Sequence, residues 1–130
     1  MDSANPVEIP NTDLLTGAVY MVSAESGQSL RIDYRIGQLN IGRYDPANDV
    51  TPDIDLSVFD AQAHGVSRLH AVLSCTTSSV QLQDLHSVNG TRYNGKLLVP
   101  DTNYTLEERG VVQFGTLALQ VIVVPLYAHR

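Results

Sequence analysis

Turn-forming residues interrupt this chain at short intervals, and short segments rich in β-branched and aromatic residues lie between the turns. Helical periodicity of any length is absent. Apolar and polar residues alternate over residues 80–83 and 117–121, as they do in strands with one buried face. This pattern predicts an all-β fold, an antiparallel β-sandwich. The expected strands are residues 18–23, 29–34, 39–43, 54–59, 68–75, 79–84, 91–94, 103–106, 111–115 and 117–124.

A chain of 130 residues can bury a core as one domain without disulfide or metal support. Residues 1–17 show no sustained periodicity, so we expect an N-terminal tail, one domain over residues 18–126 and a short tail over 127–130. The single cysteine, Cys75, follows apolar residues and is expected to be buried in a strand. No signal peptide or membrane-length apolar run is present. We therefore expect a soluble, cytoplasmic protein.

The charge of the chain argues against nucleic acid as a partner. Eight Lys and Arg stand against fourteen Asp and Glu, a net charge of −6 that repels a polyanion at long range. Four of the eight cations nevertheless lie in or beside expected loops: Arg43, Arg68, Arg92 and Lys96. A local cationic spot on an acidic body is therefore predicted. Arg92 and Lys96 fit either its rim or a solvated hairpin.

Residues 44–65 form the longest stretch of irregular composition, and their five aspartates indicate a solvated loop around one short strand. They lack the central glycine and distal glutamate of a calcium-binding EF-hand loop. The histidines have no zinc-ligand spacing with Cys75 or a carboxylate. Neither a metal nor another cofactor is therefore expected.

Two Asn-Gly pairs, Asn89-Gly90 and Asn94-Gly95, occur within residues 87–95. Asn-Gly is a strong signal for a two-residue hairpin turn, because both residues tolerate positive φ. Two such hairpins would share only Thr91–Tyr93, which is too short to pair on both sides. At least one of the two pairs must therefore serve another purpose.

Three loops carry an unusual set of hydrogen-bond donors. Residues 41–46 place Arg43 after a glycine, residues 65–71 place Ser67 before Arg68, and residues 87–95 form a serine- and asparagine-containing turn. Arginine offers a rigid fork to two phosphate oxygens, serine offers a rotatable hydroxyl, and loop backbone N–H groups add donors. Such a set suits a dianionic, oxygen-rich ligand.

The order of these motifs resembles that of the forkhead-associated (FHA) domain family, in particular its bacterial members. The resemblance covers roughly residues 38–124. It rests on Gly42-Arg43, then "SRLHA" at 67–71, "DLHSVNGT" at 84–91, Asn94-Gly95, Leu97-Leu98 and Phe114-Gly115.

The resemblance implies an eleven-stranded β-sandwich that binds phosphothreonine peptides on its loops, without catalysis. The implied partner is a protein phosphorylated by a Ser/Thr kinase. Arg43 and Ser67 would hold phosphate oxygens, Arg68 would contact the phosphate or peptide, and Asn89 would hold the peptide backbone. Ser87 and Val88 belong to the same implied ligand loop. Structural roles are implied for Gly42, His70, Gly90, Thr91, Asn94 and Gly95, with Asn94-Gly95 as the ordinary turn.

This chain departs from the family pattern at Val88, where Thr or Ser is common. A side-chain hydroxyl to the phosphate is then missing, and binding would lean more on Arg43 and Ser67. A second departure is Glu108-Arg109-Gly110, where the family usually has Gly-Asp. Val88 and the acidic loop leave open an alternative function, a phospho-independent protein assembly domain on the same scaffold.

Two further readings concern single residues. Ser67, Arg68 and His70 could suggest a hydrolase, but the sequence lacks the second glycine of a Gly-x-Ser-x-Gly elbow and the strand-to-helix turn that exposes such a serine. In the tail, Thr12 could occupy the protein's own binding site if it were phosphorylated.

Overall fold

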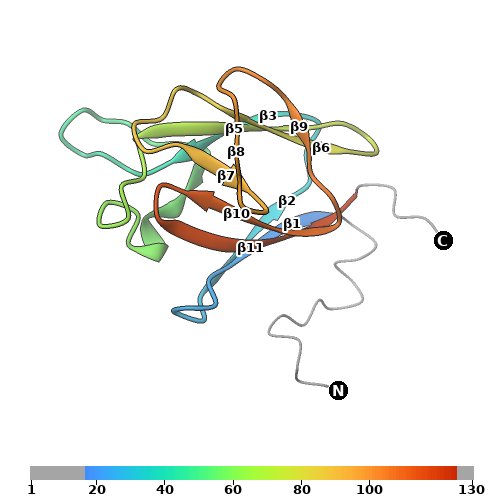
Figure 1. Ribbon diagram of the computed structural model, residues 1–130, viewed down its shortest axis with the longest axis horizontal. Helices are drawn as coiled ribbons and strands as arrows, with labels where there is room; N and C mark the ends of the chain where they lie inside the picture. Colours follow the sequence, from blue (N-terminus) through green and yellow to red (C-terminus); the bar gives the residue numbers. More distant parts are fainter. Residues whose placement is uncertain (1–16, 126–130) are drawn as a thin grey trace.

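The computed structural model describes residues 17–125, which form two β-sheets packed face to face (Figure 1). Thr12 and both predicted tails, apart from Gly17, lie outside the described residues. One sheet has the order β2-β1-β11-β10-β7-β8 and the other the order β4-β3-β5-β6-β9. The strands are β1 (Ala18–Val22), β2 (Ser29–Asp33), β3 (Gly37–Gly42), β4 (Ile54–Asp55), β5 (Leu69–Cys75), β6 (Val80–Asp84), β7 (Thr91–Tyr93), β8 (Lys96–Leu97), β9 (Tyr104–Thr105), β10 (Arg109–Phe114) and β11 (Leu117–Val124).

The predicted β-sandwich is confirmed, and its core lies between the sheets. Buried and partly exposed residues alternate along β6, as the sequence pattern predicts. In β11 the alternation ends after Val121, and the last residues are buried on both faces. Cys75 is buried in β5, as expected, and burial raises the pKa of its thiol. No helix within residues 17–125 is long and apolar enough to cross a membrane.

The structure differs from the predicted strands in three places. The segment 54–59 is a two-residue strand followed by a 3-10 helix, η1 (Leu56–Phe59). The Asp55 carboxylate caps this helix by accepting from the Ser57 N–H, and Leu56 and Phe59 are buried together one turn apart. The short strand β8 was not predicted. β4 pairs parallel to β3, whereas the other strand pairs are antiparallel.

The two Asn-Gly pairs have different conformations. Asn94 and Gly95 both have positive φ, 50° and 86°, and they join β7 to β8 as the type I′ turn that the sequence predicts. In the other pair only Gly90 has a positive φ, 85°. Asn89-Gly90 therefore does not close a two-residue hairpin and belongs to the loop between β6 and β7.

Three connections meet at one end of the sandwich, on the left of Figure 1: residues 43–53 after β3, residues 60–68 before β5, and residues 85–90 after β6. The first two of these connections come close to each other next to Gly42, the last residue of β3. A Cβ atom built there would lie 1.8 Å from the Arg68 carbonyl oxygen, and the Arg43 N–H donates to that same oxygen at 3.2 Å. Only glycine allows the two backbones to approach this closely.

Gly42→Ala should therefore destabilise the fold by about 1 to 3 kcal/mol, because backbone must move to admit the methyl group. The control is Gln38→Ala, an exposed position of the same strand, which should change stability by less than about 0.5 kcal/mol. Urea unfolding measures both. Equal unfolding midpoints for Gly42→Ala and the unchanged protein would contradict this close approach.

Candidate functional site

His70 is the buried residue on which the loop end is built. Between the pairs Ile41–Ala71 and Gly42–Leu69 the register of β5 gains one residue, which makes His70 the extra residue of a β-bulge. The side chain is fully buried and its ring meets Phe114 edge to face, with centroids 5.5 Å apart. The bulge therefore directs the His70 imidazole into the end of the core that lies next to the three loops.

Both nitrogens of the His70 ring are bonded to loop backbone. Nδ1 accepts the Ser67 N–H at 3.0 Å, and Nε2 lies 2.9 Å from the Gly90 carbonyl oxygen. A backbone N–H can only donate and a carbonyl can only accept, so the ring must be neutral with its proton on Nε2. Burial lowers the pKa of His70, partly offset by the Gly90 carbonyl and the Asp84 charge.

Ser67 is held so that its hydroxyl proton remains available. Its Oγ accepts the Val88 N–H at 3.1 Å, while its own N–H is bonded to His70. No acceptor in the described part of the chain bonds this hydroxyl, so its proton is left for an external acceptor. Val88 serves this arrangement through its backbone, and the residue as a whole is 85% exposed.

Ser67 and His70 are not arranged as nucleophile and base. The imidazole takes the Ser67 backbone proton, and no bond joins the ring to the hydroxyl oxygen. A hydrolase would need the base to contact the nucleophilic oxygen. This geometry gives no support to the hydrolase reading of the sequence.

Among residues 17–125 the Arg43 guanidinium has one hydrogen-bond partner. Its Nε donates to the Val66 carbonyl at 2.7 Å, which leaves the two terminal nitrogens to present a fork. No carboxylate within residues 17–125 is ion-paired with Arg43. An oxyanion could therefore bind this fork without displacing a protein partner.

Arg68, by contrast, is engaged. Its Nη1 lies 3.1 Å from Asp45 Oδ2, and Asp45 is held in turn by the Ala47 N–H and the Asn48 side chain. The Asn48 hydrogen bond and the Arg68 interactions lower the pKa of Asp45 despite partial desolvation. The acidic segment is thus more ordered than a solvated loop, since Asp53 and Asp55 also accept backbone N–H groups, from Asn40 and Tyr44.

A buried carboxylate, Asp84, organises the loop after β6. It accepts from the Ser87 hydroxyl at 2.5 Å and from the Thr91 hydroxyl at 2.6 Å, while the Ser87 Oγ accepts the Gly90 N–H. Burial alone would raise the pKa of Asp84, but these hydrogen bonds outweigh it and the pKa is lowered. The Ser87 hydroxyl is therefore bonded within its own loop.

Asn89 joins this loop to the one before β5. Its Nδ2 donates to the Gly65 carbonyl at 2.9 Å. A Cβ atom at Gly65 would lie 2.5 Å from that nitrogen, so a larger residue would push the amide away. Within the described part of the chain no donor bonds Asn89 Oδ1, and it remains available to a peptide N–H.

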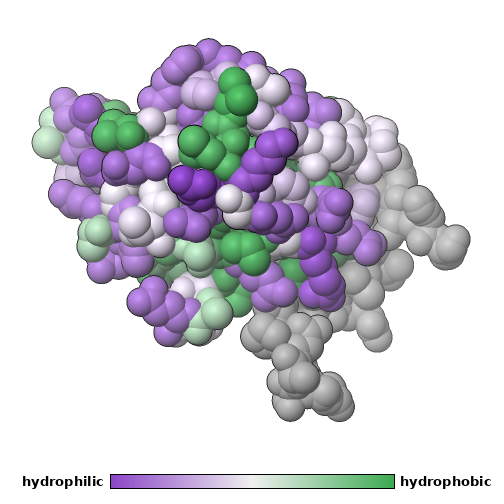
Figure 2. All heavy atoms as spheres, viewed as in Figure 1, coloured by the Kyte–Doolittle hydropathy of each residue, from purple (hydrophilic) through white to green (hydrophobic). Residues whose placement is uncertain are grey.

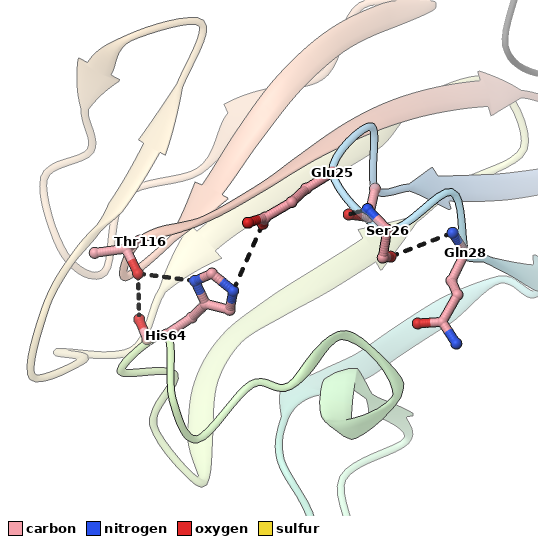
Figure 3. Close-up of polar contacts among 6 residues, drawn as sticks. Glu25, Ser26, Gln28, His64 and Thr116 are labelled. Carbon is pink, nitrogen blue, oxygen red and sulfur yellow. Dashed lines mark hydrogen bonds and ion pairs between the residues drawn. The ribbon is translucent and has the colours of Figure 1, made fainter.

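The turn between β10 and β11 is hydrogen-bonded to two of the loops, residues 60–68 and residues 85–90. Gly115 N–H donates to the Gly90 carbonyl, and Thr116 donates through its N–H and its hydroxyl to the His64 carbonyl. Figure 3 shows the His64 ring between Thr116 and Glu25, with Nδ1 3.0 Å from Thr116 Oγ1 and Nε2 3.9 Å from a Glu25 carboxylate oxygen. The loops before β5 and after β6 are thus held by the turn between β10 and β11.

An open groove of about 460 Å³ lies between the loops. The structure brings Arg43, Ser67, Arg68 and Val88 to it, together with Val50, Leu69 and His86, which the sequence did not single out. Ser87 and Asn89 lie in the same loop as His86 and Val88 but do not line the groove, and Arg92 and Lys96 lie on the β7–β8 hairpin. Within residues 17–125 no three His, Cys, Asp or Glu side chains cluster as metal ligands would.

Comparison with known proteins agrees with this architecture. The FHA domain model matches residues 39–115, and the chain belongs to the FHA domain family. It is 28% identical to protein FraH of Nostoc sp. PCC 7120 over 112 residues, and this aligned segment covers 86% of the present chain. The chain spans only 38% of the length of FraH.

Solved FHA domains share the fold. The FHA domain of the CT664 protein from Chlamydia trachomatis is 26% identical with a TM-score of 0.63, over 82% of this chain and 96% of that one. An FHA domain solved in a study of phosphothreonine-dependent FHA interactions is 25% identical with a TM-score of 0.59, over 88% and 99% of the two chains. FHA domains are interaction modules, and several of the solved relatives are bacterial.

Acid should destabilise the protein through His70. A depressed pKa in the folded state means that the unfolded chain binds more protons below about pH 6.5. Stability is therefore complete above that pH and falls as the pH decreases, because a charged ring would turn an N–H toward the Ser67 N–H. Urea unfolding between about pH 7.5 and 5 should show this loss.

The variant His70→Gln should be less stable at neutral pH and should lack most of the acid-dependent loss. His86→Gln, which removes an exposed imidazole, should keep it. A His70→Gln protein whose stability falls with acid as steeply as that of the unchanged chain would contradict the assignment.

Proposed function

We propose that this domain binds phosphothreonine peptides, and that it recruits a protein phosphorylated by a Ser/Thr kinase. The observation that carries the proposal is the pair of free donors on one groove. The terminal nitrogens of Arg43 and the hydroxyl proton of Ser67 are both available there. A phosphate brings about −1.5 to −2 charges and three acceptor oxygens, which match these donors.

The remaining predicted residues take supporting roles in this proposal. Arg68 adds positive charge beside the phosphate and is held in place by Asp45. Asn89 Oδ1 accepts a backbone N–H of the peptide. The loops are held by the close backbone approach at Gly42 and by the hydrogen bonds of His70, Gly90 and Thr91. Ser87 supports the loop through Asp84, and Val88 positions the Ser67 hydroxyl through its N–H.

Threonine is favoured over serine for a physical reason. The two phosphorylated side chains differ by one methyl group, and burying a methyl is worth about 0.8 kcal/mol. The stiffer χ1 of threonine further lowers the entropy lost on binding. A preference of about fourfold or more for phosphothreonine is therefore expected.

Arg43→Ala should weaken phosphothreonine peptide binding by about a hundredfold or more. Hydrogen bonds to charged groups contribute about 1.5 to 3 kcal/mol each, and the fork makes two. Calorimetric titration with one peptide in phosphothreonine, phosphoserine and unphosphorylated forms measures the effect. Arg92→Ala is the matched control, since it removes the same charge from an exposed position on β7.

The same titration decides between the proposal and a phospho-independent assembly domain. Arg92→Ala should retain nearly all affinity, and the unphosphorylated peptide should not bind measurably. Equal binding of the three peptide forms, or a partner bound equally well by Arg43→Ala, would overturn the proposed function and favour the assembly domain.

A further inference from the structure

The outer face of the six-stranded sheet carries a second group of buried apolar residues. Ala18 and Tyr20 of β1 and Ile122 and Val124 of β11 are between 0% and 6% exposed, and they form a cluster separate from the main core. They alternate along both strands with residues of that core, so they lie on the side of the sheet that faces away from it. The outer face of an antiparallel sheet is ordinarily solvated. Four apolar residues withdrawn from water there require a cover.

The described residues do not supply this cover. Every strand within residues 17–125 belongs to one of the two sheets, and the buried residues of η1 belong to the core between them. Among the residues that the structure describes, no third layer of strands or helices therefore lies over β1 and β11.

Other parts of the surface are open. Val111 of β10, the strand next to β11, lies on the same outer face and is 45% exposed. On the side of the molecule that Figure 2 shows, hydrophobic side chains stand in small groups among hydrophilic ones, as is normal for a protein surface. The burial is therefore particular to β1 and β11 and is not a general property of this sheet.

The chain enters this face at Gly17, the residue before Ala18. Gly17 is buried, and its φ of 81° is a left-handed conformation that bends the chain instead of extending β1. Pro125, which follows Val124 at the other end of the domain, is only half-buried. The chain is therefore more closely covered where it enters β1 than where it leaves β11, which favours the residues before Gly17 as the cover.

Two leucines precede the bend at a suitable distance. Leu14 and Leu15 lie three and two residues before Gly17. A chain advances at most about 3.6 Å per residue, so both leucines lie within about 11 Å of Gly17. Neighbouring strands are about 4.8 Å apart, and both β1 and β11 are thus within reach. Contact between these leucines and the cluster would remove apolar surface from water on both sides.

Charge favours the same segment. Arg31 of β2 and Arg109 of β10 border the apolar cluster, one on each side, in the same cross-strand row. Arg31 is ion-paired with Asp33, and within the described part of the chain no carboxylate is ion-paired with Arg109. Residues 1–16 contain three acidic residues and no Lys or Arg, whereas residues 126–130 contain an arginine and no acidic residue. The N-terminal segment is therefore the better electrostatic match.

We propose that the segment before Gly17 packs across β1 and β11, with Leu14 and Leu15 on the apolar cluster. The residues that the sequence pattern assigns to an N-terminal tail are then a cover of the sheet. This inference does not rest on the proposed function. β1 begins and β11 ends at the right of Figure 1, opposite to the loops that carry Arg43 and Ser67. The packed segment therefore holds Thr12 away from the groove.

The direct test is a nuclear Overhauser experiment on the full chain labelled with carbon-13. The methyl groups of Ile122 and Val124 and the ring of Tyr20 should show cross peaks to the methyl groups of Leu14 and Leu15. A mixture of labelled and unlabelled chains, recorded with isotope filters, should show none of these cross peaks, because the contacts are made within one chain.

A stability measurement gives a second, independent readout. Leu14→Ser with Leu15→Ser in the full chain should lower the urea midpoint by about 0.5 M or more, because the cluster loses its apolar cover. The matched control is Ile36→Ser with Val99→Ser, which removes two aliphatic side chains from residues that are 58% and 60% exposed. It should shift the midpoint by about 0.2 M or less.

Cross peaks from the cluster to residues 126–130 alone would overturn the inference and identify the C-terminal segment as the cover. Cross peaks between labelled and unlabelled chains would overturn it in favour of a second copy of the protein. A spectrum without contacts from the cluster to Leu14 or Leu15, or equal midpoints for the leucine double variant and the unchanged chain, would also overturn it.

Discussion

The neutral imidazole of His70 is the interaction on which the loop end of this molecule depends. It accepts one backbone N–H, from Ser67, and donates to one carbonyl, at Gly90, in a site closed to water. In the neutral ring Nδ1 can only accept and Nε2–H can only donate. The loop of Ser67 and the loop of Gly90 are therefore joined in one relative position. The Gly115 N–H meets the same Gly90 carbonyl from the opposite sheet, and the site is thereby tied to the core.

Local charge matters more at this site than the net charge of the chain. The protein carries −6 overall, yet among the described residues 17–125 its groove presents Arg43 without an ion-paired carboxylate and Arg68 with one. Surface charges farther than about 8 to 10 Å away are screened at physiological salt, so the distant carboxylates contribute little there. The Asp45–Arg68 pair holds the loop after β3 against the one before β5 and leaves Arg43 as the freer cation.

Much of the fold and part of the site could be predicted from the sequence. Strand periodicity and turn residues are local signals, and they placed most strands and the Asn94-Gly95 turn. The motif order placed Arg43 and Ser67, which the structure brings to one groove. The helix η1 was missed because a capping aspartate outweighed the strand-forming residues beside it. The pairing of Asp45 with Arg68, and the presence of Val50 and Leu69 in the groove, depend on contacts between distant segments that no local pattern encodes.

In the proposed function, a phosphothreonine is held between Arg43, Ser67 and the loop of Val88. The most direct measurement is a series of proton–nitrogen correlation spectra recorded while a phosphothreonine peptide is added. We expect saturable shifts that are largest for the amides of Ser67, Val88 and Asn89 and for the Arg43 side chain, and that are absent with the unphosphorylated peptide. Shifts centred on another face, or equal shifts with both peptides, would contradict it.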